Sequence, residues 1–343
     1  MHANQLLQLS MAIALSLASS CGGAGIRDQA TRGGPITIPA GDQFWVYTET
    51  SRELRDANGL VRPPEAVPVG IGHPTASGFD MDGGWGVIAY DHKIGVVQLA
   101  EAAVQWHDYS GARIEAIGVH SGAFATMSGS AVTVWNVADG KRIWETDAAA
   151  WLERESLGDL CIAIPGANRE LVVVAHKPEW LMSGPRTVIA KVDTARGNWQ
   201  PLANEDVSNE IHDLSVVTSD GSSIYLGGKL VGDRGRGKMT MDQCLKVLRY
   251  DMDRREVRTL VSDERLASIT RVLDLVAGQE LVAMILDDGV LAAYRVYDGG
   301  RASVNVLYDT EHPIPEDSRL GWVSSSRVIA IRSDGKVEVR DLP

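Results

Sequence analysis

Short strand-like runs, turn residues between them and a repeat of about fifty residues predict that this chain folds as a single β-propeller, an all-β architecture. Beyond residue 40 the apolar residues alternate with a period of two, which is the period of strands. Gly, Asp, Asn and Ser bound these runs and suit tight turns. Because a four-stranded unit cannot bury both of its faces alone, neighbouring units are expected to stack around a common axis.

The clearest repeat unit runs from Ile114 to Asp147. It contains four strand-like runs in the order IEAIGVHSG, AFATMSGS, AVTVWNV and DGKRIWETD. Four strands at this period are the sequence pattern of propeller blades. Units with strand-like runs in the same order begin near or at Phe79, Leu160, Ile211, Ile269 and Leu320.

The last unit, from Leu320, supplies only three strands before Pro343. We expect the N-terminal run at 43–51 or 35–40 to provide the fourth, so that the two ends of the chain share the closing blade. Five complete blades and one composite blade give six. Seven blades are the alternative, which would need several more strands from residues 35–72, where prolines interrupt the strand pattern at Pro63, Pro64 and Pro68.

The first forty residues are expected to be a signal and a tether. The apolar run at 6–17 is shorter than the roughly 20 residues of a membrane-spanning helix, but it suits the centre of a secretory signal. Small residues and then Cys21 follow. This pattern resembles the lipobox of bacterial lipoproteins, in which the chain is cleaved before the cysteine and the cysteine is acylated. Ala18 stands where a lipobox usually has Leu, and no Lys or Arg precedes the apolar run.

We therefore divide the chain into a lipoprotein-type signal peptide at 1–20, a flexible tether at 21–40 and a propeller domain at 41–343. The lipobox resemblance implies a firm membrane anchor at Cys21. A plain secretory signal and an apolar N-terminal helix with an incidental cysteine remain open. Gly22 after the cysteine, rather than Asp, favours the outer membrane by the sorting rule of some Gram-negative bacteria.

The hairpin at 131–144 resembles both the end of a WD40 repeat and the repeat of quinoprotein-like propellers. In the latter, a third strand ends in Asp, and Gly and then Trp follow. The resemblance implies that the Trp side chain packs between adjacent blades, and Trp135 is expected to be a packing residue as well. The matching residues are Asn136, Gly140 and Trp144, with a looser copy at Asp193, Gly197 and Trp199.

Two long connections between second and third strands form the candidate binding site. They run over 176–185 and 229–243, whereas most equivalent connections are short. In a propeller both would emerge on one face of adjacent blades and place an apolar tip beside a basic patch. A flexible insertion without a binding role is the alternative. We expect a recognition surface for an anionic partner, formed by His176, Lys177, Trp180, Met182, Arg234, Arg236 and Lys238.

Other short patterns are given structural interpretations. Gly232–Met239 resembles a P-loop, but Met239 replaces the Ser or Thr that binds Mg²⁺, and no helix is expected to follow. Asp80–Gly84 begins like a calcium loop without its terminal Glu, so a hairpin turn is expected. The histidines lack metal-binding spacing along the chain, although His120 and His212 could meet at the propeller axis.

The 343 residues carry a net charge of −12, which argues against nucleic-acid binding because that binding relies on basic contacts. Buried free thiols are expected at Cys161 and Cys244, and a disulfide between them stays open. The pattern as a whole resembles bacterial propeller lipoproteins of the cell envelope.

We predict an exported, envelope-anchored lipoprotein that binds or scaffolds a protein partner, with no cofactor and no bound metal. The oligomeric state is left open, and an enzymatic role is not favoured. A propeller hydrolase or lactonase with an axial metal is the first alternative. A carbohydrate-binding propeller that uses exposed Trp side chains is the second.

Overall fold

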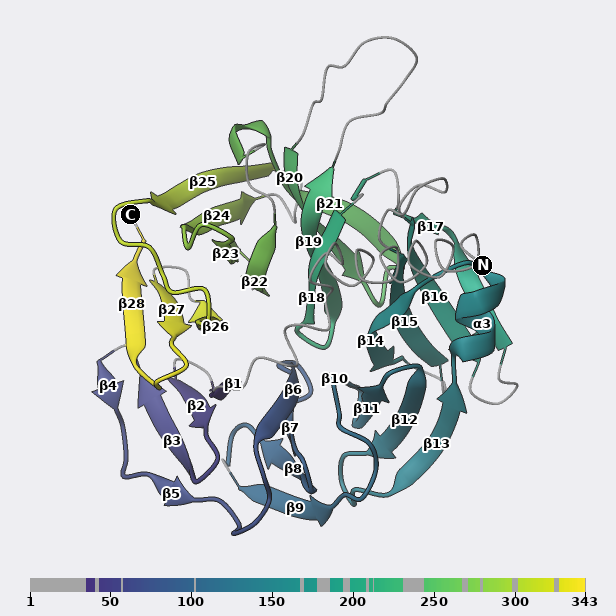
Figure 1. Ribbon diagram of the computed structural model, residues 1–343, viewed down its shortest axis with the longest axis horizontal. Helices are drawn as coiled ribbons and strands as arrows, with labels where there is room; N and C mark the ends of the chain where they lie inside the picture. Colours follow the sequence, from purple (N-terminus) through teal and green to yellow (C-terminus); the bar gives the residue numbers. More distant parts are fainter. Residues whose placement is uncertain are drawn as a thin grey trace, which may run out of the picture.

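Seven β-sheets form a ring in the computed structural model, which is seen along the ring axis in Figure 1. The structure describes residues 35–342 apart from 41–42, 57, 102, 167–169, 178–185, 194–197, 208–209, 212, 231–243, 267–270, 278–279, 298–301 and 324–326. Each sheet is one blade of a β-propeller, and each is a consecutive stretch of the chain. No helix among the described residues is long and apolar enough to cross a membrane.

The first three blades lie in the N-terminal half of the chain. Blade 1 consists of β1 (Ile36–Ala40), β2 (Gln43–Tyr47), β3 (Ser51–Asp56), β4 (Gly59–Leu60) and β5 (Glu65–Ala66). Blade 2 consists of β6 (Pro74–Asp80), β7 (Trp85–Tyr90), β8 (Lys93–Gln98) and β9 (Val104–Asp108). Blade 3 consists of β10 (Ala116–His120), β11 (Ala123–Ser128), β12 (Ala131–Asn136) and β13 (Arg142–Asp147).

A short helix, α3 (Ala149–Arg154), connects blade 3 to blade 4. Blade 4 consists of β14 (Asp159–Pro165), β15 (Glu170–Lys177), β16 (Arg186–Asp193) and β17 (Asn198–Asp206). Blade 5 consists of β18 (Asp213–Ser219), β19 (Ser223–Leu230), β20 (Cys244–Asp251) and β21 (Glu256–Asp263), followed by the 3-10 helix η2 (Glu264–Leu266). Blade 6 consists of β22 (Val272–Ala277), β23 (Leu281–Leu286), β24 (Leu291–Tyr297) and β25 (Ala302–Asp309). Blade 7 consists of β26 (Arg319–Val323), β27 (Arg327–Ile331) and β28 (Val337–Asp341).

The prediction of an all-β single propeller is confirmed, and the blade count is seven, the alternative given above. Six was wrong because residues 36–66 form a complete blade. β3 has the polar sequence SRELRD, which lacks the apolar alternation used to find strands. Pro63 and Pro64 lie between β4 and β5, and they divide the outermost strand without disrupting the sheet, because an outermost strand needs pairing on one side only.

We expected the run at 43–51 or 35–40 to complete the last blade, and this expectation is wrong. Both 36–40 and 43–47 pair within blade 1, and β28 pairs with β27. Side chains close the ring instead: Phe44 and Val46 of β2 pack against Ile329 and Ile331 of β27. β1 also begins at Ile36, within the range expected for the tether, so the propeller starts before residue 41.

The two faces of the ring carry different connections. Since neighbouring strands of a blade are antiparallel, first-to-second and third-to-fourth turns share one face, which we call the hairpin face. It includes the turns at 81–84, 121–122 and 220–222. Second-to-third connections and the links between blades lie on the opposite face, which we call the loop face.

Apolar side chains packed between neighbouring blades form the core. Between blades 3 and 4, Ala125 and Met127 of β11 pack with Val173 of β15 and Ala190 of β16. At this interface the innermost strands approach closely: a Cβ atom at Gly118 would overlap the carbonyl oxygen of Ala163. Glycine is therefore needed at Gly118 for backbone proximity rather than for an unusual dihedral angle.

Candidate functional site

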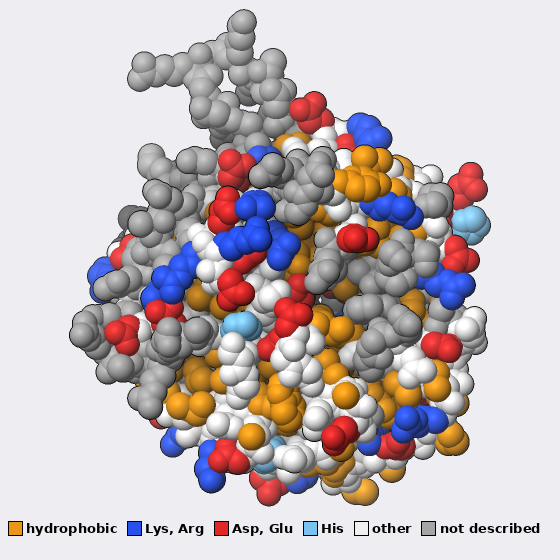
Figure 2. Space-filling model, turned by 180° about the vertical axis from the view of Figure 1, so that it is seen from behind, with side chains coloured by type: hydrophobic (Ala, Val, Ile, Leu, Met, Phe, Trp, Pro, Cys, Tyr) orange, Lys and Arg blue, Asp and Glu red, His pale blue; other side chains and the backbone are white. Residues whose placement is uncertain are grey.

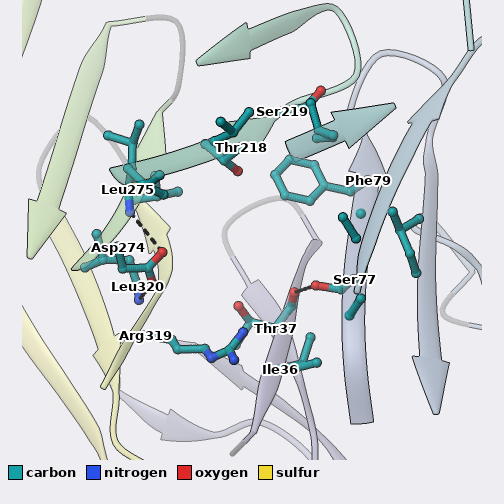
Figure 3. Close-up of a pocket in the computed structure, with 18 of the residues that line it drawn as sticks. Ile36, Thr37, Ser77, Phe79, Thr218, Ser219, Asp274, Leu275, Arg319 and Leu320 are labelled. Atoms are coloured by element: carbon teal, nitrogen blue, oxygen red, sulfur yellow. Dashed lines mark hydrogen bonds between the residues drawn. The ribbon is translucent and has the colours of Figure 1, made fainter. Parts of the chain in front are cut away.

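The innermost strands of all seven blades surround a central channel with a cavity of about 180 Å³ (Figure 3). Apolar residues such as Ile36, Ile117 and Leu275 line part of its wall. The charged residues of the lining, Glu115, Asp274 and Arg319, lie at or near the beginning of innermost strands and thus at the mouth of the channel on the loop face. Thr37 and Thr75 lie at the same end of their strands, whereas Thr218 and Ser219 lie at the opposite end, on the hairpin face.

Asp274 and Arg319 give this mouth of the channel its charge. The backbone N–H of Leu320 donates to Oδ2 of Asp274 at 2.7 Å, and that of Leu275 donates to Oδ1 at 2.9 Å. The carboxylate thus fixes blade 7 against blade 6. Figure 3 shows the Arg319 side chain extending toward Thr37 of the neighbouring blade 1. A guanidinium in a half-buried position can hold a carboxylate or a carbonyl group of a partner.

At the hairpin face, turns from blades 2 and 5 meet across the channel. The backbone N–H of Met81 in blade 2 donates to the carbonyl oxygen of Asp220 in blade 5 at 3.3 Å. Asp80 is only 2% exposed, and its carboxylate accepts from the N–H of Gly83 at 2.9 Å and from that of Ser121 in blade 3 at 3.0 Å. The buried Asp80 carboxylate therefore joins the turns of blades 2 and 3, next to the residue that contacts the turn of blade 5.

Asp220 is itself held by a tyrosine. The Tyr225 hydroxyl donates to Oδ2 of Asp220 at 2.7 Å. Burial raises the pKa of Tyr225 far above its ordinary value, and the Asp220 carboxylate adds to this. The phenol thus remains a neutral donor, and it fixes the turn that contacts Met81.

The structure places the predicted recognition residues in different settings. His176 is only 6% exposed, and its Nδ1 lies 2.9 Å from Oγ1 of Thr187, so it packs at the base of the connection and does not form a contact surface. Lys177 is half-buried at the end of β15, on the loop face. The remaining five lie outside the described residues: Trp180, Met182, Arg234, Arg236 and Lys238.

The strands that flank the two long connections support their expected placement. β15 and β16 belong to blade 4, and β19 and β20 belong to blade 5. These blades are neighbours, because Val174 and Ile189 pack in one cluster with Ile224 and Leu248. Both connections therefore start and end on the loop face, at the same end of the ring as the polar mouth of the channel.

Some of the other predicted features lie among the described residues, and others lie outside them. Asp80–Gly84 is the turn between β6 and β7, as expected. Cys161 and Cys244 are buried free thiols. His120 lies on the hairpin face with its Nδ1 3.8 Å from Asp80, whereas His212 and Gly232–Met239 lie outside the described residues. Within the described part of the chain, no group of three or more His, Cys, Asp or Glu residues could hold a metal ion.

A charged cluster on the hairpin face was not predicted. Glu170 of β15 forms ion pairs with Lys191 of β16 and, at 3.0 Å, with Arg255 of blade 5. They border a cavity of about 100 Å³ with His120. Arg255 has a φ of 55°, a left-handed value that glycine normally takes. The cluster joins blades 4 and 5, so no spacing along the chain could reveal it. Figure 2 shows how basic and acidic side chains gather on one face of the ring.

The tryptophans of the repeat pattern are packing residues, as predicted. Trp144 and Trp199 join the cluster between blades 3 and 4, and Trp199 stacks on Trp151 at a centroid distance of 5.0 Å. Trp135 stacks on Phe124 at 6.1 Å. These side chains therefore stabilise blade contacts and do not form a binding surface.

No protein-family model and no curated protein matches the sequence. Solved structures match in fold. The β-propeller domain of Myceliophteria thermophila Cps50 (Swd1) has a TM-score of 0.56 at 10% identity, with 91% of this chain and 98% of that chain covered. The RRP9 WD40 repeats have a TM-score of 0.53 at 9% identity, with 91% and 95% covered.

A propeller in a complex matches as well. It comes from the complex of KlAtg21 with the coiled coil of AgAtg16, and it has a TM-score of 0.51 at 12% identity, with 91% of this chain and 95% of that chain covered. At these identities the likeness concerns the fold alone. The chain is a β-propeller with a WD40-like fold.

Proposed function

We propose that this chain is a protein-binding or scaffold propeller that is anchored in the cell envelope and contacts an anionic partner through its loop face. The observation that carries the proposal is the asymmetry of the ring. The turns of blades 2 and 5 meet at the hairpin face through the Met81–Asp220 contact, whereas the charged mouth of the channel lies at the loop face, where the strands that flank both long connections also begin and end. One of the structural neighbours comes from the complex of KlAtg21 with the coiled coil of AgAtg16.

Charge on the loop face supports an anionic partner. The protein is acidic overall, so a local group of cations stands out against its net charge of −12. Lys177 and Arg319 lie on this face. The connection between β19 and β20 starts and ends there, and its sequence contains Arg234, Arg236 and Lys238. Opposite charges across an interface guide association and select partners.

The test is a capture of partners from envelope extract with two triple variants of equal charge change. In the first, Arg234, Arg236 and Lys238 are replaced by Ser. In the matched control, exposed cations of the hairpin face are replaced by Ser: Lys141, Arg142 and Arg254. We expect the first variant to lose acidic partners that the control retains. Equal partner sets for the two variants would contradict a recognition role for the loop face.

The anchor is proposed from the sequence around Cys21, which lies outside the described residues. Acylation there would hold the propeller at a membrane through residues 22–35. Metabolic labelling with a fatty-acid analogue tests it: Cys21→Ser should lose the label and leave the membrane fraction. For outer-membrane placement, Gly22→Asp should move the protein to the inner membrane. Retention of the label by Cys21→Ser would refute the lipid anchor.

A further inference from the structure

β28 has an unpaired edge. In blades 2–6 the third strand lies between two neighbours, but in blade 7 the third strand is the last one, and none of the strands in the described ranges pairs with its outer side. The residues Val337–Arg340 are half-buried, and Asp341 is exposed. An edge of this kind presents unpaired N–H and C=O groups and is a template for another strand.

A groove of about 600 Å³ runs beside this edge. One wall is formed by residues 334–339, and the opposite wall by the end of β3 and the turn after it, including Arg55 and Asn58. The side chains of Leu60 and Val61, next in the chain, are 52% and 41% exposed. Among the described residues, the groove beside β28 thus has an apolar stretch of chain next to one wall.

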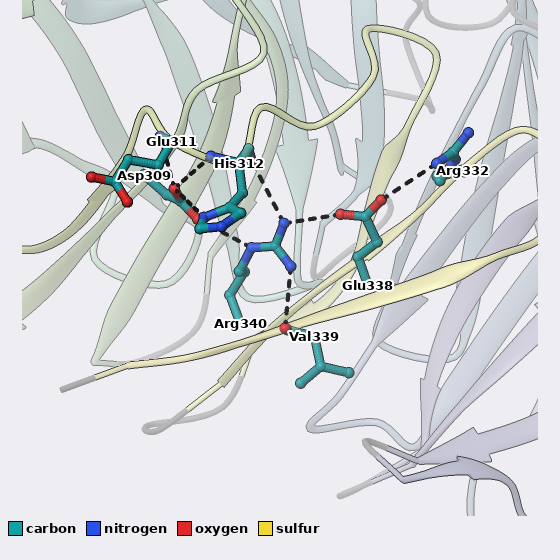
Figure 4. A network of polar contacts seen from close by, with 7 residues as sticks. All are labelled: Asp309, Glu311, His312, Arg332, Glu338, Val339 and Arg340. Carbon is teal, nitrogen blue, oxygen red and sulfur yellow. Dashed lines mark hydrogen bonds and ion pairs between the residues drawn. The ribbon is translucent and has the colours of Figure 1, made fainter.

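The side chains of β28 alternate between two surroundings. Val337 and Val339 pack toward blade 1, in the cluster that closes the ring. Glu338 and Arg340 point to the other side, where Arg340 donates to Asp309 at 3.2 Å and to Glu338 at 3.0 Å (Figure 4). The charged side of the strand thus has an acid and a base two residues apart.

We propose that β28 pairs with β28 of a second copy of this chain, antiparallel and centred on Val339. In this register Glu338 lies opposite Arg340 of the second copy, and Arg340 lies opposite the second copy's Glu338. The two central valines face each other. Cross-strand pairs of opposite charge and of β-branched residues are the contacts that stabilise antiparallel sheets.

Neighbouring symmetric registers are disfavoured by charge. If the pairing moves by two positions in one direction, Glu338 lies opposite itself, and in the other direction Arg340 does so. Like charges directly opposite each other are destabilising. A pairing moved by one position places Glu338 opposite Val339 and thus mixes the two sides of the strand. The sequence VEVRD therefore selects one self-complementary register.

Disulfide trapping of the full chain in detergent tests the register. Directly opposite Cα atoms are about 4.5–5.5 Å apart, within the range of about 4.4–6.8 Å that a disulfide spans. Val339→Cys should therefore give a covalent dimer under mild copper-phenanthroline oxidation. In Val337→Cys the two thiols would be four residues out of register, about 13 Å apart. That variant replaces a valine of the same strand and the same side, and it should stay at the level of the unmodified chain.

A second experiment separates dimer contacts from effects within one chain. In the Val339→Cys background, Glu338→Arg and Arg340→Glu each create like-charge pairs in a homodimer, but a mixture of the two variants restores both opposite-charge pairs. In a statistical mixture the mixed dimers and the two homodimers together form in equal amounts. We expect the ratio of mixed dimers to homodimers to rise roughly threefold or more. Absence of trapping at 339, equal trapping at 337, or a statistical mixture would each overturn the proposal. If another segment of the chain covers this edge, Val339→Cys will not be trapped as a dimer.

Discussion

Replacement of Asp80 by Ala should destabilise the propeller, because this carboxylate is the acceptor that joins the turns of blades 2 and 3. It is 2% exposed and accepts two backbone N–H groups, at 2.9 and 3.0 Å. A hydrogen bond to a charged group contributes about 1.5–3 kcal/mol. The two donors belong to exposed residues, Gly83 and Ser121, so water can replace part of the loss. We therefore expect a loss of about 2–3 kcal/mol.

Thermal unfolding of the purified chain, followed by circular dichroism, measures this loss. At about 2.1 cal/mol/K per residue, a 343-residue chain has an unfolding entropy of about 0.7 kcal/mol/K, so Tm should fall by about 3–4 °C. Asp82→Ala is the matched control, because Asp82 lies in the same turn and is exposed; it should shift Tm by less than about 1 °C. Equal shifts for the two variants would refute the bridging role of Asp80.

Two further predictions concern the buried parts of the ring. The guanidinium of Arg265 lowers the pKa of the buried Asp263 carboxyl, so the stability from this group is present above the ordinary aspartate pKa and is lost as pH falls through the lowered value. Asp263→Asn should therefore cost about 1–2 kcal/mol in urea unfolding at pH 7, and the difference from the unmodified chain should shrink in acid; a constant difference would contradict the linkage. Gly118→Ala should cost about 1–3 kcal/mol, because its methyl group meets the backbone of Ala163. Gly321→Ala meets side-chain atoms only, with the end of the Ile331 side chain nearest, and should cost less than about 1 kcal/mol; the reverse order would be contrary evidence.

Much of the fold could be predicted from the sequence, since strands that are buried on both faces leave a strong pattern. The unit from Ile114 to Asp147 matches β10–β13, and Gly140 lies in the hairpin between β12 and β13 with a positive φ of 63°. Blade 1 escaped because the pattern is weak where a strand is polar or divided. β3 carries alternating charges, and its neighbours β4 and β5 have two residues each.

The candidate sites could be predicted only in part, because chain spacing carries no information on contacts across the ring. The face on which both long connections begin and end could be predicted from the alternating direction of the strands alone. The contact between Met81 and Asp220 joins blades that are three positions apart, and the cluster of Glu170, Lys191 and Arg255 spans two blades. His176 was assigned to the contact surface because the connection was assumed to begin at this residue, whereas β15 extends through Lys177.

The positions of these features around the ring make the three proposals compatible with one another. The seam between blades 7 and 1 holds the edge of β28 and the start of β1, where the segment from Cys21 enters the propeller. The long connections arise from blades 4 and 5, on the far side of a seven-membered ring (Figure 1). A second copy paired at the seam would therefore leave both loop faces accessible. Two tethered propellers could then offer a pair of recognition surfaces to a single partner, and this would raise the effective affinity without any new contact.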